Sequence, residues 1–93
     1  MVSLYRPNGL ITSDQVRAAR AILRWSSEDL AHRSSVGHAT IKRLEATSGI
    51  PACNAKTLAA VQKALESAGI EFVGTPENGP GVRLHLTTSR VEN

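Results

Sequence analysis

The sequence predicts a mainly α-helical domain that ends in a β-hairpin, and three observations lead to that fold class. Four stretches place apolar residues at helical spacing, each behind a residue that can begin a helix. Residues 74–81 are dense in glycine, proline and other turn-forming residues. From residue 82 to residue 87, apolar and polar side chains then alternate, which is the period of a half-buried strand.

The first helix is expected to follow a leader of residues 1–12 and to end near Arg24. Ser13 is interpreted as its N-cap, and Asp14 places a negative charge in the first turn, where the helix dipole favours one. Arg17 lies on the outer face. The apolar stripe that should face the core consists of Val16, Ala19 and Leu23, and Arg20 falls on the same stripe.

Two short helices should follow, over roughly residues 27–34 and 38–46. Ser26 is a suitable N-cap for the first of them, and Asp29 completes a variant of the capping box. Gly37 interrupts the helical pattern before the second.

The spacing of small and apolar residues across this pair is typical of a helix–turn–helix. Ala31 lies where the two helices must approach, Ser35 and Val36 form the joint, and Ile41 and Leu44 lock the second helix to the core. The outer face of the second helix is then free to read DNA, through arginine on guanine edges and through threonine or lysine on phosphates or bases. The candidate DNA contacts on that face are His38, Ala39, Thr40, Lys42 and Arg43. Ser27, Gly37 and Arg17 are candidate DNA contacts outside it. The alternative is an ordinary helical hairpin with a solvated basic face.

The fourth helix and the hairpin complete the expected fold. Asn54 can cap a helix over roughly 55–68, with Gly69 just beyond its end. Strands are expected at 70–73 and 82–86, and a flexible tail at 87–93. Two strands alone are marginal in water, so we expect the hairpin to join two chains into a dimer. The dimerisation residues are Ile70, Phe72, Val82, Leu84 and Leu86. The alternative is that the hairpin only covers the core of one chain.

Composition and charge narrow the class of protein. Ninety-three residues with 41% hydrophobic content fit one globular domain with a modest core. The single cysteine, Cys53, excludes an internal disulfide, and no membrane span or signal peptide is visible, so a reduced, soluble, cytoplasmic protein is expected. Residues 1–43 carry a net charge of +4 and residues 44–93 a net charge of −1. A basic half favours a polyanionic partner.

The chain also resembles the lambda-repressor-like helix-turn-helix family, also called the xenobiotic-response-element or Cro-type family. The resemblance covers about residues 11–86 and is carried by Ile11–Arg20, Trp25-Ser26, Glu28–Ala31, Arg33-Ser34, Ala39–Glu45, Asn54–Leu58 and Ala68–Phe72. It implies a compact bundle of four to five helices and places His38, Ala39, Lys42 and Arg43 on recognition-helix positions. It further implies a partly buried ion pair between Arg20 and Glu45.

Three positions depart from that family's pattern. Ser27 occupies the position where members commonly carry a glutamine that contacts the DNA backbone. Ser35 stands where glycine is usual, so a left-handed turn residue should be mildly strained. Gly37 replaces the usual serine or threonine N-cap, at a cost of a few tenths of a kcal/mol. All three changes predict weaker DNA binding.

These features together predict a sequence-specific double-stranded-DNA-binding regulator of transcription. Most simply it is a dimeric repressor that binds an inverted repeat, its own promoter included, and is bound to the bacterial nucleoid when it acts. One alternative is the antitoxin of a toxin–antitoxin pair that also regulates itself, with a toxin or other regulatory protein as partner. Another is an interaction module that has lost DNA binding. No enzymatic motif is visible, and the three separate histidines predict neither a metal site nor a cofactor.

Overall fold

The computed structural model describes residues 10–86, and the expectations for residues 1–9 and 87–93 lie outside that part. Its elements are, in chain order, α1 (Ser13–Leu23), α2 (Ser27–Ser34), α3 (His38–Glu45), α4 (Ala55–Ser67), β1 (Ile70–Thr75) and β2 (Asn78–Leu84). The mainly helical class with a C-terminal antiparallel hairpin is confirmed. Within residues 10–86, no helix is both long and apolar enough to cross a membrane.

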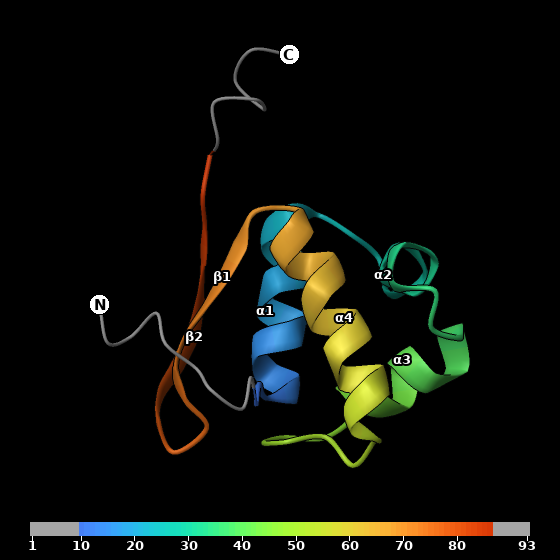
Figure 1. Cartoon of the computed structure of the whole chain (residues 1–93), viewed down its shortest axis with the longest axis horizontal. Helices are drawn as coiled ribbons and strands as arrows, with labels where there is room; N and C mark the ends of the chain where they lie inside the picture. The colour runs from blue at the N-terminus through green and yellow to red at the C-terminus, as the bar shows by residue number, and fades with distance from the viewer. Residues whose placement is uncertain (1–9, 87–93) are drawn as a thin grey trace.

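A central pair of helices is flanked on both sides by the other elements (Figure 1). The helices α1 and α4 stand side by side in the middle, the hairpin covers one side of them, and α2 and α3 lie on the other side. The core consists of apolar side chains from the four helices, from β1 and from the residue before Thr12: Ile11, Val16, Ala19, Leu30, Ala31, Ile41, Leu44, Leu58, Val61, Leu65, Ile70 and Phe72.

The start of α1 differs from the prediction in two ways. Thr12, not Ser13, is the N-cap, because the Thr12 hydroxyl accepts from the Gln15 backbone N–H at 3.0 Å while the Gln15 side chain accepts from the Thr12 N–H at 2.9 Å. This reciprocal pair is a capping box. Ile11 and Thr12 are also buried, so the leader does not extend to residue 12 as we expected. Their burial makes them part of the domain.

The other helix ends follow the sequence rules closely. Ser26 and Asp29 form the expected capping box at α2, with 3.0 Å between the Asp29 N and the Ser26 Oγ. The Asp29 carboxylate accepts from the Ser26 backbone N–H at 2.8 Å, and the pKa of this carboxyl is lowered, first by that bond and then by the Ser26 hydroxyl. Asn54 caps α4 by accepting from the Thr57 N–H at 2.7 Å. These three bonds satisfy backbone groups that a helix start leaves open.

The hairpin turn is much shorter than predicted. The expected turn over 74–81 is wrong, because β1 continues to Thr75, which pairs with Asn78 across a two-residue turn. Glycines allow this pairing: Gly74 has a φ of +77°, and a Cβ there would lie 2.1 Å from the Gly79 carbonyl oxygen. The ladder is irregular between Val73 and Thr75, as a bulge requires. Turn-forming residues therefore bend a strand here instead of interrupting it.

The hairpin is fastened to the helices by its inner face and by one polar side chain. Ile70 and Phe72 are each only 3% exposed, and the Gln15 side-chain amide donates to the Val73 and Gly81 carbonyl oxygens at 3.1 and 2.8 Å. Both strands are thus held against α1 and α4 of the same chain. The apolar surface that we assigned to a second copy is largely covered within one chain at these two positions.

The remaining predicted dimerisation residues stay partly accessible. Val82 and Leu84 are half-buried against the edge of the core. Leu86 lies beyond the end of β2 and is 72% exposed. These positions do not test the prediction of a dimer; of the five predicted dimerisation residues, Val82, Leu84 and Leu86 are the ones that remain accessible to a second copy.

Candidate nucleic-acid interface

The helix α3 buries one face and presents the other. Its buried residues are Ile41, Leu44 and Glu45, and its exposed residues are His38, Ala39, Lys42 and Arg43. Thr40 is half-buried at the edge of the exposed face. The structure therefore places all five residues expected on the outer face of this helix on or beside one surface.

The cations of this face form no ion pair within the described part of the chain. Among residues 10–86, no carboxylate lies within ion-pair distance of Lys42 or Arg43. In the described part of the chain, Arg43 donates only to the Thr40 hydroxyl, at 3.2 Å and one turn earlier. Exposed cations with no protein counterion attract an external anion at little desolvation cost. We name His38, Ala39, Thr40, Lys42 and Arg43 the α3 outer face.

The C-terminal end of α3 is held by side chains of α1. The Ser13 hydroxyl donates to the Leu44 carbonyl oxygen at 2.6 Å and lies 3.1 Å from the Thr47 hydroxyl. The Arg17 guanidinium donates to the Glu45 carbonyl oxygen and, at 2.9 Å, to that of Thr47. These donors satisfy carbonyl groups that the end of a helix leaves open. They also match the partial negative charge of that end.

Arg17 therefore has a different position from the one expected. We expected a free cation on the outer face of α1, but Arg17 is half-buried and also pairs with Asp14. Sequence reasoning missed these contacts because the carbonyl partners lie 28 and 30 residues away along the chain. A DNA contact by Arg17 remains a prediction, and it would have to share this side chain with the fold.

The predicted pair between Arg20 and Glu45 is present at the same junction. The guanidinium Nε and Nη2 donate to the two carboxylate oxygens at 2.8 and 3.0 Å, so the contact is bidentate. The Glu45 side chain is only 8% exposed and that of Arg20 24%. Arg20 also donates to the Trp25 carbonyl oxygen at 3.0 Å. One arginine thus joins α1, the end of α3 and the segment that leads into α2.

The N-terminal end of α3 has fewer side-chain contacts than the C-terminal end. Gly37 supplies no side-chain cap, and the turn before it contains Ser35 at a φ of +60°, as predicted from the missing glycine. The Val36 N–H donates to the Ala31 carbonyl oxygen at 3.1 Å, which closes the end of α2. The only side-chain link from α2 to the first turn of α3 within residues 10–86 joins the Ser27 hydroxyl to His38 Nε2, at 2.9 Å.

Ser27 and His38 together form a small polar pair at the edge of the α3 outer face. Ser27 is half-buried and His38 is exposed, so the bond fixes the imidazole ring beside the start of α2. The sequence placed both residues at the interface but contained no signal for their contact. The pair brings a ring nitrogen and the open N-terminus of α3 to the same place, where backbone N–H groups can also meet an anion.

Other candidate chemistry is spread out. Within residues 10–86, no three His, Cys, Asp or Glu side chains lie close enough together to hold a metal ion. Partial burial raises the pKa of the Cys53 thiol, which disfavours its reactive thiolate form. His85 Nε2 lies 2.6 Å from Glu71 on the hairpin, and this contact is the largest cause of the lowered pKa of Glu71.

Comparison with known proteins leaves the site to be interpreted from its geometry. No model of a protein family matches this chain, and a search of curated proteins finds no significant match to it.

Proposed function

We propose that this chain is a sequence-specific double-stranded-DNA-binding regulator of transcription with a lambda-repressor-like fold. The observation that carries the proposal is the α3 outer face, whose cations have no carboxylate within ion-pair distance in the described part of the chain. The helix is anchored beneath by buried Ile41 and Leu44. It is therefore a rigid element with a free polar surface, which is what readout of a DNA groove requires.

The proposed division of labour follows from the chemistry of each side chain. Arg43 can donate two hydrogen bonds to guanine O6 and N7 in the major groove, while Lys42 and Thr40 can contact phosphates or base edges. Ser27 and the N-terminus of α3 would hold a neighbouring phosphate. The proposed activity is binding alone, with no catalytic step and no cofactor.

We further propose that the active species is a dimer on an inverted repeat, acting as a repressor that blocks the promoter it covers. Two-fold operators separate their half-sites by about one helical turn, roughly 34 Å, so two recognition helices must be tied together. The half-buried Val82 and Leu84 and the exposed Leu86 are the hairpin residues available for that contact. Sedimentation of the full chain, free and on DNA, tests the dimer separately from DNA binding.

Selection of bound sequences from random duplex DNA tests the main proposal. We expect enrichment of one motif, repeated in inverted orientation if the dimer forms, and binding that weakens steeply with salt because bound cations release counterions from the phosphates. Equal, weak binding of selected and random duplexes at low salt contradicts the regulator proposal. Enrichment of a single half-site would support sequence-specific DNA binding and contradict the proposed dimer.

A further inference from the structure

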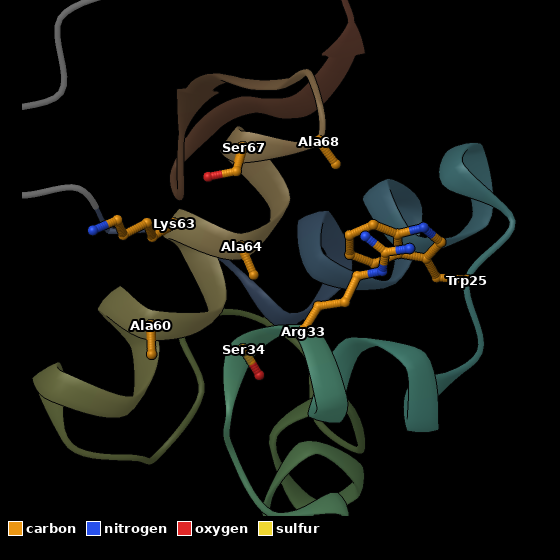
Figure 2. A pocket seen from close by; sticks show the side chains of 8 residues that line it. All are labelled: Trp25, Arg33, Ser34, Ala60, Lys63, Ala64, Ser67 and Ala68. Carbon is orange, nitrogen blue, oxygen red and sulfur yellow. The ribbon is translucent and has the colours of Figure 1, made fainter. Parts of the chain in front are cut away.

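A groove begins between α2 and α4 (Figure 2) and continues between the end of α1, the end of α4 and Leu84 of β2; α3 contributes no residue to its lining. It consists of two hollows of about 430 and 730 Å³ that have Trp25, Arg33, Ser67 and Ala68 in common. We call the combined feature the Trp25 groove. None of the residues of the α3 outer face line it, so it is a separate surface from the proposed DNA interface.

The floor of the groove is low because α4 places alanine there at every fourth residue. Ala60 and Ala64 of α4 and Ala68, the C-cap residue of that helix, line this floor, and the Trp25 ring forms the opposite wall (Figure 2). Residues spaced by four lie on one helix face. From Ala60 to Ala68 the floor is about 12 Å long at 1.5 Å per residue. The hollow is thus elongated and open along its length.

The rim carries positive charge that the fold does not neutralise. The Arg33 guanidinium lies over the Trp25 ring at 4.5 Å from its centroid. A stacked guanidinium keeps its edge N–H groups available for a carboxylate. Among residues 10–86, no carboxylate lies within ion-pair distance of Arg33, Lys63 or Arg24. Asp29, one turn before Arg33, acts on it only at longer range.

Apolar side chains continue the groove at one end. Ile22 is 42% exposed there, beside the half-buried Leu23 and Leu84, and Glu66 is the single carboxylate in the lining of the two hollows. Exposed apolar surface with a polar rim is typical of a protein-interaction site. An isolated anion would leave Ile22 and the alanine floor uncovered. A partner that bears both carboxylates and apolar side chains would match both parts of the surface.

We infer that the Trp25 groove docks an acidic segment of a partner protein whose carboxylates flank apolar side chains. The apolar side chains of that segment lie on the alanine floor and against Ile22, and its carboxylates pair with Arg33, Lys63 and Arg24. The positive rim complements the carboxylates of such a segment, and the floor is long and open. Small molecules favour enclosed pockets, so these two features favour a chain segment as the ligand. The inference does not depend on DNA binding.

Selection of binding peptides from a random display library on the intact protein tests this docking site. We expect the enriched peptides to combine Asp or Glu with apolar residues and to change the fluorescence of Trp25, the single tryptophan of the chain, when the peptides lack tryptophan themselves. No enriched peptides, or enriched peptides without an acidic bias, overturn the inference.

Three variants separate groove binding from attraction to a basic protein. Arg33→Glu should lower the affinity for the enriched peptides at least tenfold. Lys42→Glu, the same charge change on the α3 outer face, should leave that affinity within about twofold of the wild-type value. Ala64→Arg adds a cation but fills the floor, so groove binding predicts a loss and simple charge attraction a gain. Circular dichroism melts check folding; if Ala64→Arg fails to fold, the Arg33 and Lys42 pair decides.

The same variants separate this inference from the proposed function. Arg33→Glu should retain the selected DNA motif while losing the peptides, and Lys42→Glu should do the reverse. If the wild type and Arg33→Glu bind the peptides with equal affinity, the inference that the Trp25 groove docks an acidic segment is wrong, whatever the result for DNA.

Discussion

The two ends of α3 are built in opposite ways. At the C-terminal end, Ser13, Arg17 and Arg20 of α1 bind its carbonyls and the buried Glu45 carboxylate. At the N-terminal end, Gly37 provides no side-chain cap, and the Ser27–His38 bond is exposed. The polar groups at the first end are bound within the fold, whereas the second end has, within residues 10–86, a single side-chain bond to another element, which is exposed. The anchoring contacts of this eight-residue helix lie at its C-terminal end and on its buried face, whereas the proposed DNA contacts lie on its outer face, which extends into the last turn through Lys42 and Arg43.

The same contrast applies to charge. Arg20 and Glu45 neutralise each other away from water, whereas Lys42 and Arg43 stand in solvent with no carboxylate within ion-pair distance among residues 10–86. Removing a charge from the first pair should therefore affect stability, and removing one from the second should affect binding. Two charge substitutions test this separation, and two serine substitutions test the N-terminal end of α3.

The largest effect is expected for Glu45→Ala. It leaves Arg20 partly buried without its bidentate partner, and breaking a buried pair costs about 3–5 kcal/mol. Because the Arg20 side chain is 24% exposed, we expect the loss near the lower limit, about 3 kcal/mol. Urea unfolding followed by circular dichroism measures it. Glu66→Ala, an exposed glutamate on α4, is the control and should change stability by less than about 0.5 kcal/mol.

An unfolding curve of Glu45→Ala that overlaps the wild-type curve would show that the ion pair does not anchor α3. The contrast between the two ends would then rest on the Ser13 and Arg17 contacts alone.

Arg43→Ala should have the opposite profile. Loss of a bidentate base contact costs about 1–3 kcal/mol of DNA-binding free energy and relaxes the preference at one base pair. Stability should change by less than about 0.5 kcal/mol because the side chain is exposed and, among residues 10–86, donates only to Thr40. Binding measurements on the selected duplex and on single-base variants test both parts. Lys63→Ala, an exposed cation on α4, is the matched control and should leave DNA binding unchanged.

Unchanged base preference of Arg43→Ala would remove Arg43 from base readout. Equal weakening on every duplex would assign it to a phosphate instead.

The helix ends were predictable because local hydrogen bonds decide them. Ser26 with Asp29, Asn54 with Thr57 and the left-handed Ser35 follow from residues three or fewer positions apart. Ser13 shows where local rules fail, because both Thr12 and Ser13 are good N-caps. The Leu44 carbonyl, 31 residues away, takes the Ser13 hydroxyl and leaves the cap to Thr12. The Thr12-x-x-Gln15 spacing was the one signal that could have chosen correctly.

The hairpin shows the limit of composition as a guide. A run with Gly74, Gly79 and Pro80 indicates a loop, yet cross-strand pairing extends through it once the glycines adopt positive φ. The sequence could not predict what buries the hairpin either. Strand alternation puts Ile70 and Phe72 on one face, but it does not indicate whether helices of the same chain or a second copy cover that face. The exposed face of α3 was easier to predict, because amphipathic spacing alone separates the buried Ile41 and Leu44 from the exposed Lys42 and Arg43.

Ser27→Ala should have a smaller effect than either charge substitution. It removes an exposed hydrogen bond to His38, for which we expect about 0.5–1 kcal/mol of DNA-binding free energy. The physical reason is that the imidazole loses a fixed position while remaining in the interface. His38→Ala and the double variant complete a cycle that measures the coupling by DNA affinity. Additive losses would mean that the two side chains act on DNA independently.

The smallest effect is expected for Ser35→Gly, at the joint before α3. Ser35 has a φ of +60°, a conformation that costs a residue with a side chain about 1 kcal/mol or more, whereas glycine adopts it freely. Part of that gain is offset because glycine also loses more backbone entropy on folding, so a net stabilisation of a few tenths of a kcal/mol is expected. Thermal unfolding against Ser48→Gly, an exposed loop serine outside the helices, measures it. A decrease in melting temperature would mean that Ser35 stabilises the turn by contacts that outweigh its strain, and the N-terminal end of α3 would then be less sparingly built than its missing cap indicates.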